Sequence, residues 1–279
     1  MRSLFLGTSA FAVPSLHVVA SRTQLAGVVT QPDRPAGRGQ RLRPSPVKSA
    51  AIALGVPVYE PLRLRSFAAE IAAEPFDLFV LASYGRILPR ELLDLPRLGA
   101  LNVHPSLLPK YRGATPIQTA IMQGEKETGV SIILMDTGLD TGEIVLAQRV
   151  PIGPAETYGE LHDRLAVIGA ELLAQAIDLA ARGQLEGRPQ AGEASLTTPI
   201  LKGDLTLDLS WPPERIVDRV RALSPQPAAR AALGGEVVKI LRAHVAPDGT
   251  LAIDELIAPS RGKMSGEAYK RSRGARDRQ

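Results

Sequence analysis

The feature that most constrains the fold is the alternation of short apolar runs with helix-like stretches along the first 150 residues. The apolar runs, bounded by glycine, proline or polar residues, cover residues 2–7, 25–30, 77–82, 100–104 and 129–135. The candidate helices cover residues 12–20, 46–54, 64–73 and 116–123. Buried strands that alternate with helices are typical of an α/β fold with a mostly parallel sheet. Ligands of such sheets bind at the carboxyl ends of the strands, so the residues after Ala82, Val103 and Met135 are candidates for a site.

The rest of the chain predicts a second, smaller domain. Apolar side chains recur at helical spacing over residues 158–182, which predicts a long amphipathic helix. The stretch that follows is rich in glycine, proline, serine and threonine, a composition typical of a linker. A helix over residues 213–223 and strands over 236–244 and 250–257 come next. We therefore expect a large domain over residues 1–184, a linker over 185–203 and a small β-rich domain over 204–279.

Composition narrows the classes of chemistry. None of the 279 residues is cysteine, which excludes disulfides, zinc sites made of thiolates and cysteine nucleophiles. No run approaches 18 apolar residues, and the first apolar run reaches glycine too soon for a signal peptide. We therefore expect a cytoplasmic protein without a membrane segment.

The charges are unevenly distributed, although the net charge is only +4. The stretch 34–48 contains no acidic residue, and its basic residues are Arg34, Arg38, Arg41, Arg43 and Lys48. The stretch 261–279 holds seven basic and two acidic residues, and we expect it to be a frayed, solvated tail. The first stretch follows a predicted strand and lacks apolar residues that could dock it. Because arginine binds phosphate in a bidentate manner, this basic loop predicts binding of nucleic acid or a nucleotide.

The predicted strand 100–104 carries two polar residues, Asn102 and His104, on one face, because side chains two apart in a strand point to the same side. Pro105 and Pro109 follow, so both polar residues lie at the end of the strand. A lone histidine in an apolar strand is more often a hydrogen-bonded core residue than a functional one. The pair at the expected ligand edge favours a functional role.

A second polar feature follows the predicted strand 129–135, where two Asp-Thr-Gly turns begin at Asp136 and Asp140. Aspartate is a common turn residue that bonds its own backbone. An aspartic protease would need its two turns on distant loops, and the spacing lacks the ligand set of a helix–loop–helix calcium site. A carboxylate able to approach His104 is the interpretation we favour, because it would orient the imidazole and stabilise its charged form.

Together these residues resemble the folate-dependent formyltransferases. The resemblance rests on Asn102 and His104, on the stretch 106–118 (SLLPKYRGATPIQ) and on Asp140, which lies 36 positions after His104. Residues 31–48 and the C-terminal region narrow it to the methionyl-tRNA formyltransferases. It implies a Rossmann-like, mostly parallel sheet domain followed by a small OB-like β-barrel. It also implies transfer of a formyl group from 10-formyltetrahydrofolate to the α-amine of methionine on initiator tRNA, without a metal.

The resemblance also assigns roles to residues. Asn102, His104 and Asp140 match the catalytic trio, and the stretch 81–88 (LASYGRIL) matches a wall of the pterin pocket. The segment that contacts tetrahydrofolate matches Ser106, Leu107, Leu108 and Pro109. Arg38 matches a position that engages the acceptor stem of the tRNA, and the other basic residues of its loop are expected to assist. Asn102 and His104 would donate to the oxyanion, while Asp140 would position His104 and help to move a proton.

The C-terminal end departs from the family pattern, because few residues separate its last predicted strands and an aromatic residue common after residues 224–227 is absent. We therefore expect an abridged barrel, in a protein that is a monomer. Three alternatives stay open: the same formyl transfer to another amine, such as an amino-sugar nucleotide or glycinamide ribonucleotide; a noncatalytic RNA-binding protein; and a hydrolase that releases formate from formyl-folate.

Overall fold

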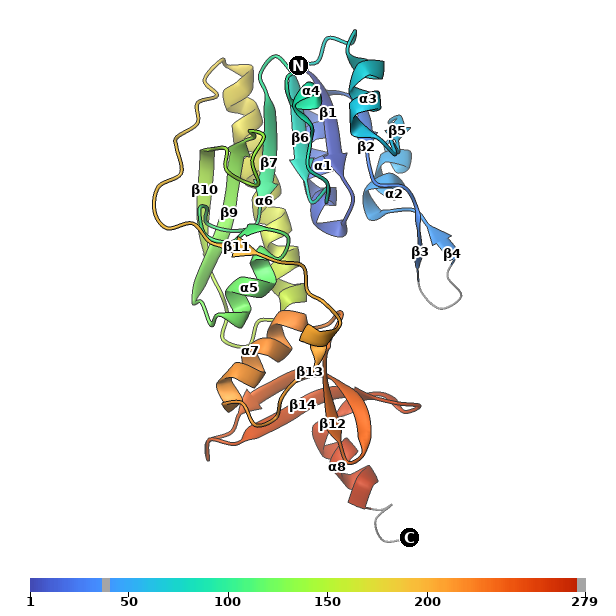
Figure 1. Cartoon of the computed structure of the whole chain (residues 1–279), viewed down its shortest axis with the longest axis vertical. Coiled ribbons are helices and arrows are strands. Elements are labelled where there is room, and N and C mark those ends of the chain that lie inside the picture. The colour runs from blue at the N-terminus through green and yellow to red at the C-terminus, as the bar shows by residue number, and fades with distance from the viewer. Residues whose placement is uncertain (37–40, 275–279) are drawn as a thin grey trace. The chain divides into compact units, whose positions relative to one another are not determined.

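The computed structural model describes residues 1–36 and 41–274 of the chain (Figure 1). Its contacts divide the chain into two compact units, each built from several stretches. The first unit contains residues 1–114, 129–150 and 163–196. The second contains residues 115–128, 151–162 and those from 197 onward. The second unit therefore includes two earlier stretches of the chain, 115–128 and 151–162, as well as the C-terminal region.

Within the described residues, seven strands form the sheet of the first unit. They are β1 (Arg2–Gly7), β2 (Gln24–Val29), β5 (Val58–Tyr59), β6 (Leu78–Ala82), β7 (Ala100–His104), β9 (Glu127–Leu134) and β10 (Glu143–Pro151). Their order is β10-β9-β7-β6-β1-β2-β5. The pairs β1–β2, β1–β6, β2–β5 and β6–β7 are parallel, whereas β9 is antiparallel to β7. The mostly parallel sheet predicted from the alternation is confirmed.

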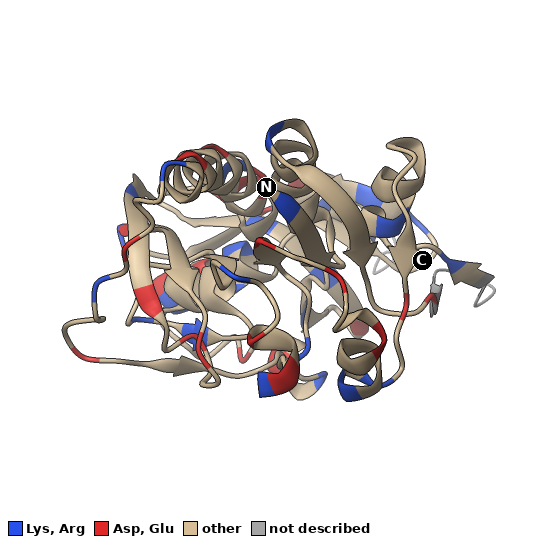
Figure 2. Ribbon diagram, turned by 90° about the horizontal axis from the view of Figure 1, so that it is seen from above, with Lys and Arg blue, Asp and Glu red and all other residues tan. Residues whose placement is uncertain are grey.

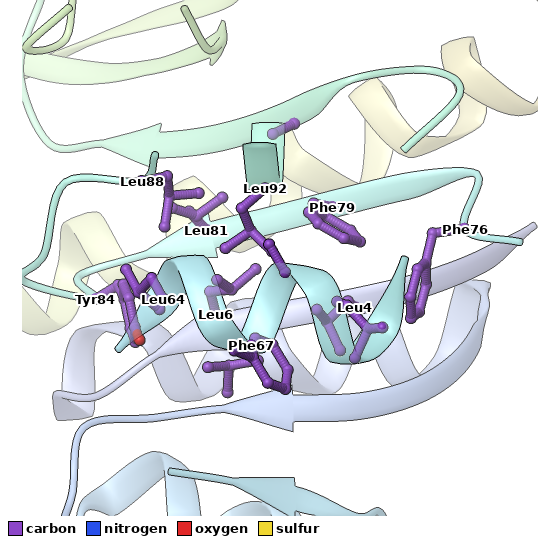
Figure 3. Close-up of a cluster of buried hydrophobic side chains, with 14 residues drawn as sticks. Leu4, Leu6, Leu64, Phe67, Phe76, Phe79, Leu81, Tyr84, Leu88 and Leu92 are labelled. Atoms are coloured by element: carbon purple, nitrogen blue, oxygen red, sulfur yellow. The ribbon is translucent and has the colours of Figure 1, made fainter. Parts of the chain in front are cut away.

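Helices cover both faces of this sheet, so its central strands are buried; all five residues of β6 are buried, as expected for a parallel strand. On one face, α3 (Leu64–Ile71) and α4 (Arg90–Leu93) complete a cluster that includes Phe67, Phe79 and Leu92 (Figure 3). The other face carries α1 (Val13–Arg22) and α6 (Tyr158–Ala181). Arg22 of α1 pairs with Asp178 of α6 at 2.6 Å.

The first unit also contains shorter helices and strands. They are the 3-10 helix η1 (Ala10–Ala12), the strands β3 (Arg34–Ala36) and β4 (Arg41–Arg43), the helix α2 (Pro46–Ala53) and the strands β8 (Arg112–Gly113) and β11 (Leu196–Thr197). The helix α2 begins after Ser45, whose hydroxyl accepts from the backbone N–H of Lys48 at 3.0 Å, as an N-cap does. This cap fixes the start of the helix that carries Lys48.

The second unit is a small antiparallel sheet with its own core. Its sheet has the sequential order β12 (Ala229–Leu233), β13 (Glu236–Val245), β14 (Leu251–Ala258) and β15 (Gly262–Ser265). The other elements are α5 (Pro116–Met122), the 3-10 helix η2 (Gly203–Leu205), α7 (Pro213–Leu223) and α8 (Gly266–Gly274). Ile216, Val220 and Leu223 of α7 pack on this sheet. The predicted fold class, a parallel-sheet domain followed by a small β domain, is confirmed. Within the described residues the sheet has one strand fewer than the five of an OB-fold.

The prediction of a frayed C-terminal tail is wrong as far as Gly274. Residues 266–274 form α8, whose Tyr269 is 5% exposed and donates from its hydroxyl to the carbonyl of Leu233 at 2.8 Å. Arg261 lies over the Tyr269 ring and pairs with Glu236. One buried aromatic side chain therefore fixes a segment whose charge predicted solvation. Among the described residues, no helix combines the length and the apolar character needed to cross a bilayer.

Candidate active site

The strand β7 brings Asn102 and His104 to the carboxyl edge of the sheet. His104 is 4% exposed, and Asn102 is half-buried. The chain turns immediately after His104, because the N–H of Ser106 donates to the carbonyl of His104 at 2.9 Å. The Ser106 hydroxyl then donates to the carbonyl of Lys110 at 2.6 Å. This closed turn fixes the direction in which the histidine leaves the strand.

Asp140 also lies beside Asn102 and His104, but the strand before it does not run in the direction that the sequence predicted. We expected the end of the third apolar run to lie beside the ends of the other strands, and this is wrong, because β9 runs antiparallel to β7 and pairs Leu134 with Leu101. The loop after β9 instead folds back toward Asn102. Asp140 adopts a left-handed backbone conformation with φ of 52° in this loop. Aspartate tolerates this conformation better than most residues.

Two hydrogen-bond donors and one ring nitrogen converge on the carboxylate of Asp140. The Asn102 amide donates to Oδ1 at 3.3 Å, and the backbone N–H of Gly113 donates to Oδ2 at 2.8 Å. The Nδ1 atom of His104 lies 3.6 Å from Oδ2. The three residues predicted as a catalytic trio are therefore brought together.

The hydrogen bonds of His104 determine its tautomer. Its Nε2 atom lies 3.0 Å from the carbonyl oxygen of Tyr111, which can only accept, so Nε2 carries a proton and donates it. Burial lowers the pKa of His104 below its ordinary 6.5, against the opposing effects of Asp140 and the Tyr111 carbonyl. In the neutral imidazole Nδ1 therefore carries a lone pair and faces the carboxylate. This atom is the one able to accept and return a proton.

A hollow of about 480 Å³ lies at the same edge of the sheet. The loops after β1, β2 and β6 line it, with Thr8, Gln31 and Ser83 among its walls. The chain order reverses between β1 and β6, because β2 and β5 lie on one side of β1 whereas β6 and β7 lie on the other. Such a switch point is where open α/β sheets bind ligands. His104 ends the strand next to β6, so the hollow and the trio share one edge.

Comparison with known proteins adds to this geometry. The family model described as formyl transferase matches residues 1–177, and the model of the formyl transferase C-terminal domain matches residues 199–274. A methionyl-tRNA formyltransferase from Xanthomonas axonopodis pv. citri (strain 306) is 46% identical over 261 residues, which cover 90% of this chain and 85% of that protein. The chain belongs to the methionyl-tRNA formyltransferase family. The family predicted from the sequence is thus confirmed.

Solved structures share the fold of this family member. A methionyl-tRNA formyltransferase from Clostridium thermocellum superposes with a TM-score of 0.60 at 18% identity, over 95% of this chain and all of that one. An N-formyltransferase from Helicobacter canadensis, in complex with folinic acid and dTDP-3-aminofucose, gives a TM-score of 0.69 at 20% identity over 88% of each chain. At these identities the likeness concerns the fold alone.

The segment expected to contact folate is mostly buried in this formyltransferase. Ser106, Leu108 and Pro109 are buried, and Leu107 is half-buried over Gly129. The Leu108 N–H donates to the Ser131 hydroxyl at 3.2 Å. The segment can therefore offer a ligand its backbone and Leu107 more readily than its other side chains.

The basic residues predicted to bind tRNA fall into two environments. Arg34, Arg41 and Arg43 lie on the paired strands β3 and β4, and the Arg43 side chain is exposed. Figure 2 colours the lysine and arginine positions of the ribbon blue. Arg38 lies outside the described residues. Lys48 differs, because its ammonium donates to Asp33 at 2.9 Å and to Glu60 at 2.7 Å, and these hydrogen bonds, that to Glu60 first, raise its pKa. Its charge is engaged within the protein.

Some residues that shape the site were given no individual role by the sequence analysis. Gly113 and Tyr111 act through backbone atoms, which composition does not reveal. Gln190, which contacts the loop of Asp140, lies in a stretch that its composition assigned to a linker. Within residues 1–36 and 41–274, no group of three or more His, Asp and Glu side chains is arranged to hold a metal ion.

Proposed function

We propose that this protein transfers the formyl group of 10-formyltetrahydrofolate to the α-amine of methionine on initiator methionyl-tRNA. The observation that carries the chemistry is the convergence of Asn102 and His104 on the carboxylate of Asp140. The observation that supports the acceptor is the 46% identity to a relative named for that reaction. The residues needed for acid–base chemistry and those matched by the family therefore coincide.

The reaction forms one C–N bond and breaks another. The neutral α-amine attacks the formyl carbon, and the carbonyl oxygen becomes an oxyanion in the tetrahedral intermediate. The amide of Asn102 has two N–H groups, of which one donates to Asp140, so the second can donate to this oxyanion. Removal of one such donor typically costs about 10²–10³ in rate. Collapse of the intermediate then breaks the bond between the formyl carbon and the folate nitrogen.

One proton must move from the attacking nitrogen to the leaving nitrogen. The Nδ1 atom of His104 is suited to accept it, because Nε2 is already protonated and held by Tyr111. The carboxylate of Asp140, 3.6 Å away, stabilises the imidazolium that forms. The proton then passes to the folate nitrogen as it leaves. A free α-amine has a pKa of about 7.7–8.0, so a useful neutral fraction exists near neutral pH without a stronger base.

The hollow gives the substrates room at the same edge of the sheet as this trio. Its volume lies within the range of about 300–1,000 Å³ that is usual for ligand pockets. Ser83, Tyr84 and Gly85 line it, and they belong to the stretch 81–88 that was expected to contact the pterin. We place the pterin against this wall, with the turn from Ser106 to Pro109 beside it. This arrangement directs the formyl group toward the end of β7.

The tRNA is recognised through charge and through the second unit in this proposal. Arg34, Arg38, Arg41 and Arg43 contact phosphates of the acceptor stem, since basic residues bind a polyanion by releasing its counterions. Residues 1–184 carry the catalysis, residues 185–203 link the domains, and residues 204–279 hold the tRNA. We further propose that the protein acts in the cytoplasm as a monomer.

The test is transfer of labelled formyl from 10-formyltetrahydrofolate to a panel of acceptors. The panel contains initiator methionyl-tRNA, elongator methionyl-tRNA, free methionine and an amino-sugar nucleotide, with the variant His104→Ala as the catalytic control. We expect transfer to the initiator alone, and none with the variant. Transfer to the sugar nucleotide would assign the chemistry to another amine. Release of formate without any acceptor would show a hydrolase, and folate or tRNA binding without turnover would show a noncatalytic protein.

A further inference from the structure

The segment after helix α6 lies against the catalytic loops, although its composition is that of a linker. Residues 163–196 group with the first unit. Arg188 forms a reciprocal backbone bridge with Ile144, with N···O distances of 2.8 and 2.9 Å, so the segment runs beside the start of β10. Two residues later the segment reaches the loop that carries Asp140.

Gln190 uses every hydrogen-bonding group of its side chain at this point. Its Nε2 atom donates to the carbonyl oxygens of Asp140 and Gly142, both at 2.8 Å. Its Oε1 atom accepts from Nε of Arg112 at 3.1 Å and from Nη2 at 2.6 Å. The orientation of the amide follows from these partners, because a flipped amide would place oxygen against two carbonyls and NH₂ against a guanidinium. Gln190 therefore ties the Asp140 loop to Arg112.

Ser195 acts in the same way on the other side of the trio. Its hydroxyl accepts from the N–H of Tyr111 at 2.9 Å, and its carbonyl accepts from the N–H of Arg112 at 2.9 Å. The carbonyl of Tyr111 in turn holds His104. The segment therefore supports both the carboxylate and the imidazole of the catalytic pair.

The backbone conformations explain why such support is needed. Asp140 has φ of 52° and Tyr111 has φ of 62°, and both are non-glycine residues in the left-handed region. This region is sparsely populated and persists where surrounding contacts hold it. Gln190 binds the carbonyl of the first residue, and Ser195 binds the N–H of the second. The two conformations thus depend on the same short segment.

We infer that Gln190 is a positioning residue for Asp140, so that the segment 188–195 is part of the catalytic site rather than only a connection between domains. The inference rests on the proposed function, because it assigns a role to Gln190 in that reaction. Gln190 acts through the backbone of Asp140 and Gly142, and the carboxylate that faces His104 is set by that backbone. The role requires the Nε2 donor, which glutamate lacks.

The test compares Gln190→Glu with Gln184→Glu in the intact protein. Glutamate at position 190 can still accept hydrogen bonds from Arg112. Its other carboxylate oxygen, however, faces the carbonyl oxygens of Asp140 and Gly142, to which it cannot donate. The control makes the same charge change at an exposed residue of the same segment, whose side chain bonds Arg182 instead. We expect kcat to fall about 10- to 100-fold in Gln190→Glu, since a misplacement of about 1 Å can cost about 10²-fold. The KM values for folate and tRNA stay near those of the control.

A double-variant cycle separates positioning from simple destabilisation. In an Asp140→Asn background, measured by single turnover at high enzyme concentration, Gln190→Glu should add little further loss, because the two residues act as a unit. A fully additive loss, or a kcat equal to that of Gln184→Glu, overturns the inference. If Gln190→Glu does not fold, Gln190→Met removes the same hydrogen bonds without adding a charge.

A readout without substrate keeps this inference separate from the proposed function. The imidazole nitrogen resonances of His104 should move in Gln190→Glu and stay unchanged in Gln184→Glu. If the wild-type protein fails to formylate methionyl-tRNA while these resonances move, the proposed function fails and the positioning role stands. If the protein formylates methionyl-tRNA but the His104 resonances and kcat are unaffected, the positioning role fails alone.

Discussion

The proposed catalytic trio and the basic strand pair β3–β4 are held in opposite ways. Around the trio, the carboxylate of Asp140 accepts from a backbone N–H and an amide, and His104 is buried with both ring nitrogens facing polar atoms. The strands β3 and β4, by contrast, pair over three residues each, and Arg43 is exposed at the end of the second strand. The first region is fixed by its own contacts, whereas the second ends in an exposed charge.

This difference matches the roles that we propose for the two regions. Proton transfer requires atoms at hydrogen-bond distances, so the trio gains from contacts that fix its geometry. Attraction to phosphates depends on charge and acts over several ångströms, so it tolerates a less constrained side chain. We therefore expect substitutions in the trio to reduce kcat and substitutions in the basic strand pair to change the affinity for tRNA and its dependence on salt.

The largest effect should come from Asp140→Asn, which keeps the shape but removes the negative charge facing His104. We expect kcat to fall by about 10²–10⁴, the usual contribution of a positioned acid–base group, while the KM for tRNA changes little. The matched control is Asp136→Asn in the neighbouring turn. There the carboxylate accepts from the Gly138 N–H at 3.0 Å, and asparagine can do the same. Equal kcat values for the two variants would contradict the assignment of Asp140.

The titration of His104 tests the same region without substrate. Because burial lowers its pKa, we expect Nδ1 to stay unprotonated as the pH falls below the ordinary value of 6.5. The effect on stability follows from this lowered pKa. Above pH 6.5 the folded protein has its full stability; as the pH falls from there through the lowered pKa, the unfolded state takes up the proton more readily and this stability is lost. Nitrogen NMR, with the resonance assigned by its loss in His104→Ala, measures this directly. Protonation of Nδ1 above pH 6.5 would contradict the expectation.

A smaller effect, on binding rather than chemistry, is expected for Arg43→Ala. Loss of one phosphate contact should reduce the slope of log affinity against log salt by about 1, with kcat nearly unchanged. Arg90→Ala on α4 is the control, since Arg90 is exposed and pairs with Asp94 on its own helix. Measurement of tRNA binding across a salt series distinguishes them. A slope that is the same in both variants would remove Arg43 from the tRNA surface.

Lys48→Ala sharpens the comparison, because Lys48 belongs to the basic stretch in sequence but is engaged by Asp33 and Glu60. We expect the salt slope to stay at the wild-type value and the free energy of unfolding to fall by about 1 kcal/mol, since two half-buried carboxylates lose their donor. Thermal unfolding and the salt series together check this. A slope lower by about 1 would instead place Lys48 with the arginines, as its sequence position suggested.

The sequence predicted the parts that depend on local pattern. The strands 2–7 and 100–104 and the helix 213–223 were predicted at the bounds that the structure shows, because buried runs and a proline at the helix start are local signals. It did not predict β10, in which Gln148 and Arg149 are exposed polar residues that interrupt the apolar pattern. It also missed the direction of β9, since antiparallel pairing depends on where the chain returns and not on the strand's own residues.

In the candidate site, too, the residues that form a local sequence pattern were predicted and those that act through tertiary contacts were not. Asn102, His104 and Asp140 were identified because their side chains and spacing form a pattern. Gly113 contributes only a backbone N–H, and Gln190 contributes an amide from a stretch with linker composition. Contacts of this kind arise from tertiary structure, so no property of a single sequence window reveals them. They are nevertheless the contacts that fix the geometry of the predicted trio.

The smallest effect concerns Glu160, a carboxylate held by backbone like Asp140 but without a role in chemistry. At the start of α6, Thr157 and Glu160 cap each other: the Thr157 N–H donates to Glu160 at 2.8 Å. This bond first, and then hydrogen bonds from the Thr157 hydroxyl and Arg242, lower the pKa of Glu160 to about 2. In Glu160→Gln we expect a loss of at most about 1 kcal/mol at neutral pH, because the side chain is half exposed and screened by solvent.

The pH dependence of that loss in stability shows whether it comes from the charge of Glu160 or from packing. A lowered pKa stabilises the folded state above the unfolded value of 4.5, and this advantage disappears as the pH falls toward about 2, where the wild-type carboxylate is also neutral. The gap in melting temperature between wild type and Glu160→Gln should therefore close over that interval, with kcat at neutral pH equal in both proteins. A gap independent of pH would attribute the loss to packing. A reduced kcat would mean that a carboxylate held by backbone affects catalysis even at a distance from the trio, which would break the comparison with Asp140.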